Sequence, residues 1–346
     1  MKKNRLVHSA GKRILAAAIA LAAVLLPGCA SPARQQASAP HLKKLVIAEP
    51  VHLSGYLPLY VAQREGYFKE QGLEVKVIQA TGGTHVTAVV SGDAWGVIGG
   101  GDSIVLGNKN NSDPITAVCN CVNRANVYLF SKEGTAPKSK SKADLKEFLK
   151  GKTIVAGRHG GSPNLLTRYL LLNLGLNPEK DVRLIENSDA STVVSMLQNG
   201  NGDIGNGAEP QICEGIEKKV WEEPFYKFTD LGDFSYSVFG VKKSTIEKDP
   251  ETVQKFVNAI LKALKAVQND HALAKKILTE EFPTLTEAQV KASLDRAYAD
   301  NLWSPDGSIS KKAVTTDMDM LLKTGIYTGS YSYDKLVNMQ FVKKNQ

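Results

Sequence analysis

The chain has 346 residues, of which 42% are hydrophobic and 23% are charged. This composition is typical of a globular protein, and the length allows two lobes of roughly 100 to 200 residues, each with its own core. The formal net charge is +8, but five of the cations lie within residues 1–28, which leaves +3 on the rest of the chain. The positive charge is therefore no indication of nucleic-acid binding.

Residues 1–28 have the pattern of an export signal. Five lysines and arginines come first, and an uncharged run over 14–26 follows that is too short to span a bilayer comfortably. The run ends in LPGC at 26–29, which resembles the lipobox of bacterial lipoproteins and marks Cys29 for acylation. We expect a signal peptide over 1–28, a flexible tether over 29–41 and a lipid anchor that holds the chain outside the cytoplasm. A plain secretory signal, or a buried cysteine, is the alternative.

Three further cysteines, Cys119, Cys121 and Cys213, are too few and odd in number for a disulfide framework. Cys119 and Cys121 are two residues apart, which on a strand places both side chains on one face in a poor geometry for a disulfide. No His or Cys partners follow at the spacing of a zinc site. We therefore expect no metal, and we expect these cysteines to be small residues in a wall or core.

From residue 44 onward, short apolar runs alternate with helical patterns. Residues 45–48 and 74–78 are expected to form strands, and residues 59–70 and 84–91 to form helices. This alternation is typical of parallel strands with helices on both faces of the sheet.

The same alternation begins again after residue 150. Strands are expected at 152–156 and 181–185, and helices at 163–174 and 191–198. Two similar series in one chain indicate two α/β lobes.

Two apolar, strand-like segments, 126–130 and 236–240, separate the two series. They are predicted to cross between the lobes and to form a two-strand hinge. The first lobe would then comprise residues 42–130 and 236–346, and the second lobe residues 131–235.

The last third of the chain has a helical pattern. Asp249 and Pro250 supply an N-cap and a first helical residue, and an apolar stripe runs over 253–267. We expect these helices to complete the first lobe, and the molecule to be a monomer.

Residues 55–75, GYLPLYVAQREGYFKEQGLEV, resemble the opening of the solute-binding proteins of ABC importers in the nitrate, sulfonate, taurine and thiamine-precursor group. The resemblance continues through SGD at 91–93, GLNPEKDV at 175–182 and DPETV at 249–253, and covers nearly all of 42–325. It implies an α/β protein with the type II periplasmic-binding-protein fold, in which two lobes close on a small-molecule ligand. It also implies partner permease subunits in the membrane.

The sequence departs from this family pattern in one place. Trp95 stands where members usually carry an acidic residue, and the neighbouring segment 97–103 is unusually rich in glycine. Ligand identity therefore does not transfer directly from the resemblance.

In open α/β sheets, ligands bind beyond the carboxyl ends of the strands, where loops lead into helix N-termini. The loops at these positions carry glycines, hydroxyls, imidazoles and two carboxylates. The candidate ligand-binding residues are His52, Ser54, Tyr56, Thr84, His85, Asp102, Ser103, Asn123, His159, Gly161, Ser162, Ser188 and Glu209.

Three of these candidates have a structural alternative. His52 would otherwise be a surface-loop histidine, Thr84 an N-cap, and Glu209 a hydrogen-bond partner within the fold. Asp102 would repel a sulfonate and accept an amine or a ring N–H. A zwitterionic or heterocyclic ligand is therefore at least as compatible with the set as a simple oxyanion.

The sequence thus favours an extracytoplasmic binding protein that captures a small polar nutrient (a sulfonate, a nitrate-like anion or a thiamine-pyrimidine-type heterocycle) and delivers it to an ABC permease. The resemblance also extends to thiamine-pyrimidine synthases, which need a pyridoxal-binding lysine, and no lysine stands in an identifiable cleft loop. A ligand-sensing domain for a membrane receptor is the other alternative. Residues 157–163, GRHGGSP, lack the Gly-Lys-Ser/Thr ending of a phosphate-binding loop. We expect no catalytic residue, no cofactor and no nucleic-acid partner.

Overall fold

The computed structural model describes residues 42–187 and 189–344, which belong to one compact unit, Pro40–Gln346. The expected signal peptide, the tether up to residue 41 and the acylated Cys29 lie outside the described residues. Within the described part of the chain, no helix is long and apolar enough to cross a membrane.

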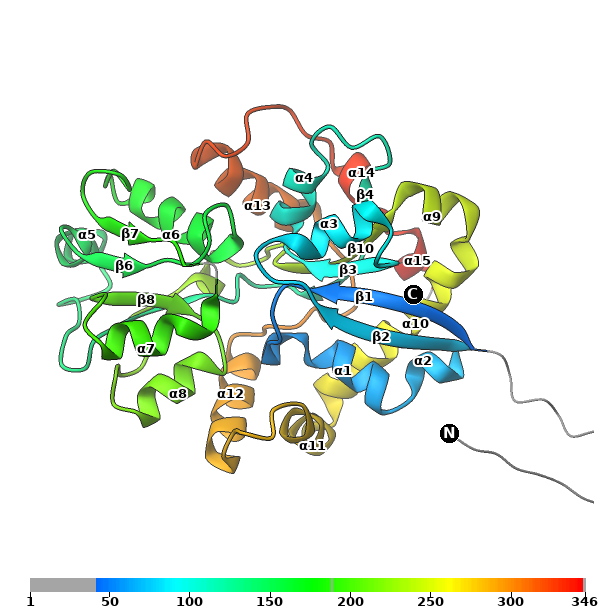
Figure 1. The fold of residues 1–346 in the computed structure, drawn as a ribbon, viewed down its shortest axis with the longest axis horizontal. Helices are drawn as coiled ribbons and strands as arrows, with labels where there is room; N and C mark the ends of the chain where they lie inside the picture. The colour runs from blue at the N-terminus through cyan, green and yellow to red at the C-terminus, as the bar shows by residue number, and fades with distance from the viewer. Residues whose placement is uncertain (1–41, 188, 345–346) are drawn as a thin grey trace, which may run out of the picture. The chain divides into compact units, whose positions relative to one another are not determined.

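A five-stranded sheet forms the centre of the first lobe (Figure 1). Its strands, in spatial order, are β2 (Leu73–Gln79), β1 (Lys43–Glu49), β3 (Gly96–Gly99), β10 (Ser237–Lys242) and β4 (Ile115–Val122). β1 runs parallel to β2 and β3, whereas β10 runs antiparallel to β3 and β4. β4 is buried along its whole length although it ends the sheet, because α14 (Tyr333–Leu336) and α15 (Gln340–Lys343) pack against it.

Helices cover both faces of this sheet. In Figure 1, α3 (Thr84–Ser91) and α4 (Gly101–Gly107) lie on one face, and α1 (Leu57–Arg64), α2 (Tyr67–Glu70) and α10 (Pro250–Asn269) lie on the other. α10 begins as the sequence predicts, because Asp249 accepts a hydrogen bond from the N–H of Thr252 and Pro250 is the first helical residue. The remaining helices of this region are α9 (Lys243–Lys248), α11 (His271–Glu281), α12 (Glu287–Ala299) and α13 (Lys311–Lys323).

The second sheet repeats the same arrangement of strands. Its order is β7 (Arg183–Ile185), β6 (Thr153–Val155), β8 (Ile204–Gly207), β5 (Tyr128–Ser131) and β9 (Tyr226–Lys227). β6 runs parallel to β7 and β8, and β5 runs antiparallel to β8 and β9. Its helices are α5 (Lys142–Leu149), α6 (Ser162–Asn173), α7 (Val193–Gln198) and α8 (Gln211–Glu217). The prediction of two α/β lobes is therefore confirmed.

The strand expected to leave the first lobe belongs instead to the second sheet. The sequence analysis places 126–130 in the first lobe, but β5 pairs with β8 and β9. All four residues of β5 are buried, and an apolar run of this kind carries no mark of the sheet that it joins. The lobe limit at residue 130 thus falls within a strand, and we propose that the chain passes between the lobes at 123–127 and 232–236.

These two crossing segments are hydrogen-bonded to each other. The backbone N–H of Phe234 donates to the carbonyl of Asn123 at 3.2 Å. The side chains of Asn123 and Arg124 both donate to Oδ1 of Asp233, at 3.2 and 2.6 Å. The two crossings are thereby coupled at the point where a two-lobed molecule bends.

A further contact between the lobes is made at the end of α12. Nε of Arg296 donates to Glu209 at 2.9 Å, and Asp300 accepts from the hydroxyl of Tyr128 and from Nζ of Lys227, both at 2.6 Å. The partners of each pair are 73 to 172 residues apart in the chain. No local sequence pattern therefore marks them.

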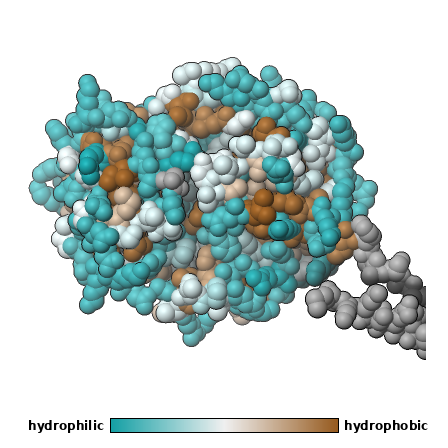
Figure 2. All heavy atoms as spheres, in the orientation of Figure 1, coloured by the Kyte–Doolittle hydropathy of each residue, from teal (hydrophilic) through white to brown (hydrophobic). Residues whose placement is uncertain are grey.

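The surface is mixed in polarity. On the face shown in Figure 2, apolar residues form separate patches among hydrophilic ones. Isolated apolar residues at a surface are normal for a globular chain and need no partner to explain them.

Candidate ligand-binding site

A cavity of about 160 Å³ lies between the two sheets. Its walls come from the segments that follow β1, β2, β3, β6, β7 and β8, and from the two crossing segments. Its polar lining residues include Tyr56, Gln79, Thr81, His85, Ser103, Asn126, Arg158, Ser162, Asn187, Asp189, Asn206, Gln211, Tyr236 and Ser237. The cavity thus occupies the place where open α/β sheets bind ligands.

Five of the candidates from the sequence analysis line this cavity. They are Tyr56, His85, Ser103, Gly161 and Ser162, and they come from both lobes. Burial raises the pKa of Tyr56, and that of Tyr236 beside the same cavity, above the usual range of a phenol. Both residues therefore present uncharged hydroxyl groups at neutral pH.

His52 lies behind the cavity wall, in a polar and aromatic cluster. Its ring packs at 4.6 Å against the rings of Tyr60 and Phe282, and its Nδ1 lies 3.0 Å from Glu49. Burial lowers the pKa of His52, but the hydrogen bond and the charge of Glu49, together with Glu281, outweigh it and raise that pKa. His52 is neither a cavity residue nor a free surface histidine.

Ser54 and Thr84 hydrogen-bond within the fold instead of lining the cavity. Ser54 donates to the carbonyl of Glu209 at 3.2 Å, and Thr84 donates to the carbonyl of Thr81 at 2.7 Å. Thr84 is not an N-cap either, because the cap position of α3 is Gly83, which has a φ of 91°. That left-handed conformation favours glycine.

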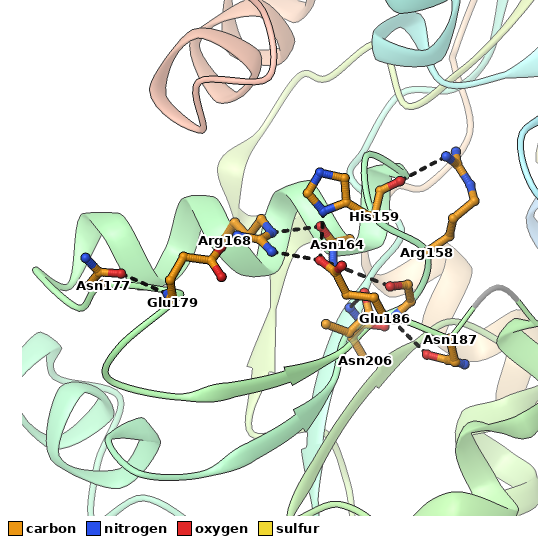
Figure 3. Close-up of polar contacts among 11 residues, drawn as sticks. Arg158, His159, Asn164, Arg168, Asn177, Glu179, Glu186, Asn187 and Asn206 are labelled. Atoms are coloured by element: carbon orange, nitrogen blue, oxygen red, sulfur yellow. Dashed lines mark hydrogen bonds and ion pairs between the residues drawn. The ribbon is translucent and has the colours of Figure 1, made fainter.

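Asn123 and His159 also lie outside the cavity lining. Asn123 belongs to the crossing segment, where it binds Asp233. His159 is exposed, and its Nδ1 lies 2.9 Å from Glu186. Figure 3 shows its ring directed toward Glu186, whereas the side chain of Arg158 extends away from that group. Ser188 lies outside the described residues.

Glu209 belongs to a buried polar network rather than to the cavity. Its Oε1 accepts from Arg296 at 2.9 Å and from the thiol of Cys213 at 3.2 Å, and its Oε2 accepts from the N–H of Cys213 at 3.1 Å. Burial and the neighbouring Glu209 raise the pKa of Cys213 to about 12. The structural alternative for Glu209 thus describes its position.

Asp102 joins the lobes and does not face the cavity. It is 1% exposed, and its Oδ1 accepts from the hydroxyl of Ser162 at 3.0 Å and from the N–H of Ser103 at 2.7 Å. Asp317 of α13 is buried nearby and accepts from Ser235 at 2.6 Å. Burial raises the pKa of both carboxyls, and the charge of Asp102 raises that of Asp317 further. Ionisation of one of these carboxyls therefore disfavours ionisation of the other.

Arg158 lines the cavity but is not among the candidates drawn from the sequence. Its Nη1 donates to the carbonyl of His159 at 3.0 Å, and no ion pair to it is found among the described residues. A Cβ on Gly83, in the other lobe, would lie 3.2 Å from Cζ of Arg158. The guanidinium therefore reaches across to the turn before α3. The sequence signal that could have identified Arg158 is its position in the loop that follows the strand at 153–155.

Amide side chains make up much of the rest of the lining. Asn206 donates to the carbonyl of Ala156 at 2.8 Å, and Asn187 accepts from the N–H of Gly157 at 3.1 Å. These bonds fix the loop that carries Arg158. Such short-range polar support is what holds a binding group in one orientation.

Other proteins have the same fold. The alkanesulfonate-binding protein SsuA of Xanthomonas axonopodis, in a structure bound to MOPS, has a TM-score of 0.69 at 17% identity, over 87% of this chain and all of that chain. This likeness, with the strand orders above, defines a type II periplasmic-binding-protein fold.

Sequence relatives agree with this class. The putative binding protein YtlA of Bacillus subtilis is 29% identical over 310 residues, which are 88% of this chain and 90% of that protein. A 4-amino-5-hydroxymethyl-2-methylpyrimidine phosphate synthase of Saccharomyces cerevisiae, THI13, is 25% identical over 70% of this chain and 72% of that protein. The model of the NMT1/THI5-like family matches residues 54–273. The chain belongs to the NMT1/THI5-like family.

Replacing Glu209 tests its structural role. We expect Glu209→Gln to lower the free energy of unfolding by about 2 kcal/mol, since a buried charge-assisted hydrogen bond is lost. The affinity of the Glu209→Gln variant for a solute that the unmodified protein binds should change less than twofold. Urea unfolding and titration calorimetry measure the two effects, and the exposed Glu222→Gln is the control, expected to alter neither. A loss of affinity without a loss of stability would contradict the structural role and show that Glu209 contacts the ligand.

Replacing Asp317 tests the buried carboxyl pair through pH. Because the folded state holds the proton of Asp317 to higher pH than the unfolded state, its contribution lowers stability as pH rises above the ordinary carboxyl range. We expect Asp317→Asn to remove this loss of stability at higher pH. Its stability relative to the unmodified protein should increase from pH 4 to pH 8, by at most about 1.4 kcal/mol per pH unit. A difference that is constant with pH in urea unfolding would contradict the assignment.

Proposed function

We propose that this protein is the extracytoplasmic solute-binding component of an ABC importer. The observation that carries the proposal is the central cavity, whose walls are strand-end loops from both lobes. A hydrogen bond between Ser162 and Asp102 joins the two lobes beside this cavity. Closure of two lobes around a small solute is a general form of ligand capture by hinge motion. The relatives named as binding proteins support the same reading.

The cargo is a small polar solute with a negatively charged group. The cavity of about 160 Å³ is close to the roughly 150 Å³ that accommodates benzene in another protein. Arg158 is the cation of the lining, and it makes no ion pair among the described residues. Charge-assisted hydrogen bonds to a guanidinium are strong and favour carboxylates, sulfonates and phosphates.

We also propose where the protein is located and how it is attached to the membrane. The export signal and lipobox over 1–29 support a lipid-anchored, monomeric chain outside the cytoplasm that passes its cargo to permease subunits. The location, the lipid anchor, the monomeric state and the partner permease are inferred from the sequence pattern and from the family.

A synthase activity is the second candidate, because THI13 is a relative by sequence. Among the described residues, no lysine lines the cavity, so no side chain there could form an imine with an aldehyde cofactor. Cys121 is fully buried and does not line the cavity, and burial raises its pKa well above the usual range of a thiol, which disfavours the thiolate form. The cavity therefore favours binding over catalysis.

Removing the charge of Arg158 tests the proposed cargo. We expect Arg158→Gln to weaken the binding of an anionic solute by roughly tenfold to a hundredfold, since a charge-assisted hydrogen bond contributes about 1.5–3 kcal/mol. Titration calorimetry of refolded, ligand-stripped protein against nitrate, ethanesulfonate, taurine and pyrimidine carboxylates measures the effect.

Arg183→Gln is the matched control, because Arg183 is an exposed arginine of the same lobe. It should leave affinity unchanged. Equal affinities for both variants would contradict the role of Arg158, and failure of the unmodified protein to bind any small molecule would contradict the function itself.

A further inference from the structure

His85 is a buried polar residue at the cavity whose side chain has no hydrogen-bond partner among the described residues. It stands in the first turn of α3, is 3% exposed and lines the cavity. Neither of its ring nitrogens has a hydrogen-bond partner in the described part of the chain. The ring lies against the backbone of β3, where a Cβ on Gly99 would be 2.9 Å from Nε2.

Such a residue is unusual in a folded protein. Buried polar side chains are nearly always hydrogen-bonded, because an unpaired one loses its contacts with water and gains nothing in return. An apolar side chain would fill the same space at lower free energy. The imidazole is therefore explained by a partner that comes from outside the chain.

The surroundings of His85 keep its ring uncharged. Burial and the charge of Arg158 lower the pKa of His85 to about 4. Asp102 does not line the cavity, and its Oδ1 accepts from Ser162 and Ser103. A neutral imidazole offers one N–H donor and one nitrogen acceptor.

His85 and Arg158 thus pair with different chemical groups of the same solute. The guanidinium, from the second lobe, pairs with a negative charge. The imidazole, from the first lobe, has an acceptor nitrogen that needs an N–H or O–H donor, which a deprotonated oxyanion lacks. Both residues line the central cavity and an adjoining outer hollow. An inorganic oxyanion such as nitrate would satisfy the guanidinium but would leave much of the cavity unfilled.

We propose that His85 selects the cargo through an uncharged hydrogen-bonding group, so that the cargo is an organic anion that also carries an amide, hydroxyl or ring-nitrogen group. This inference rests on the proposed function and narrows it to one class of solute. His85 is the residue that sets the specificity within that class.

The test is a capture experiment in which the protein itself selects the solute from a mixture. Unmodified protein, His85→Leu and His85→Gln are unfolded, stripped of small molecules, refolded and equilibrated with the fraction of yeast extract below 1 kDa. Bound compounds are released and identified by mass spectrometry. Ser91→Ala, an exposed substitution in the same helix outside the central cavity and the outer hollow, is the control.

We expect the unmodified protein and Ser91→Ala to retain an organic anion with an uncharged polar group, and His85→Leu to retain at least tenfold less of it. His85→Gln should recover part of the loss, because an amide keeps one donor and one acceptor. The midpoint of thermal unfolding of stripped His85→Leu should be equal to or above that of the unmodified protein. A merely structural histidine would lower that midpoint.

The outcomes separate the two proposals. Capture of an inorganic anion, a cation or an uncharged compound by the unmodified protein would overturn the inference and leave the binding function standing. Equal capture by His85→Leu would overturn the role of His85. Failure of the unmodified protein to retain any small molecule would overturn the proposed function.

Discussion

The hydrogen bond between Ser162 and Asp102 joins the two lobes beside the central cavity, and it depends on the absence of a side chain at Gly100, two residues before the carboxylate. A Cβ on Gly100 would lie 1.9 Å from Oδ1 of Asp102 and 2.7 Å from Oγ of Ser162. A Cβ on Gly101 would lie 2.6 Å from both Asp317 and Ser235. Only Gly100 meets a residue of the opposite lobe, Ser162, whereas Gly101 meets Asp317 and Ser235 on its own side. A side chain at Gly100 would thus block the approach of the two lobes at the start of α4, and one at Gly101 would disturb packing within the first lobe.

Polar groups in this protein divide into those that hold the fold and those left for a solute. Glu209 and Arg296 pair across the lobes, as do Asp300 and Lys227. Arg158 and His85 have no such partners among the described residues, although both line the cavity. Of the buried side chains with an unpartnered polar atom in the described part of the chain, only His85 and Ser237 line the central cavity, and only His85 has both of its polar atoms unpartnered.

Periodicity and strand-end position were sufficient to predict the architecture and the loops of the site. Alternating runs gave both series of strands and helices, and the loops at 81–85, 99–103 and 157–163 do meet at the cavity. The sequence could not show which sheet takes up β5, because pairing depends on the whole fold. Nor could it separate Ser162, which faces the cavity, from His159, which turns to Glu186. His52, Asn123 and Glu209 lie outside the cavity lining, which the sequence could not show either, because their partners are set by tertiary packing.

The central claim is that the two lobes close around a solute, and the distance between them tests it most directly. With Cys29→Ser, labels can be placed at Lys76→Cys in the first lobe and Ser195→Cys in the second, because Cys119, Cys121 and Cys213 are buried. Single-molecule energy transfer between these labels should shift to a shorter mean separation when a solute that calorimetry shows to bind is added. A separation that stays unchanged at saturating solute would contradict the account.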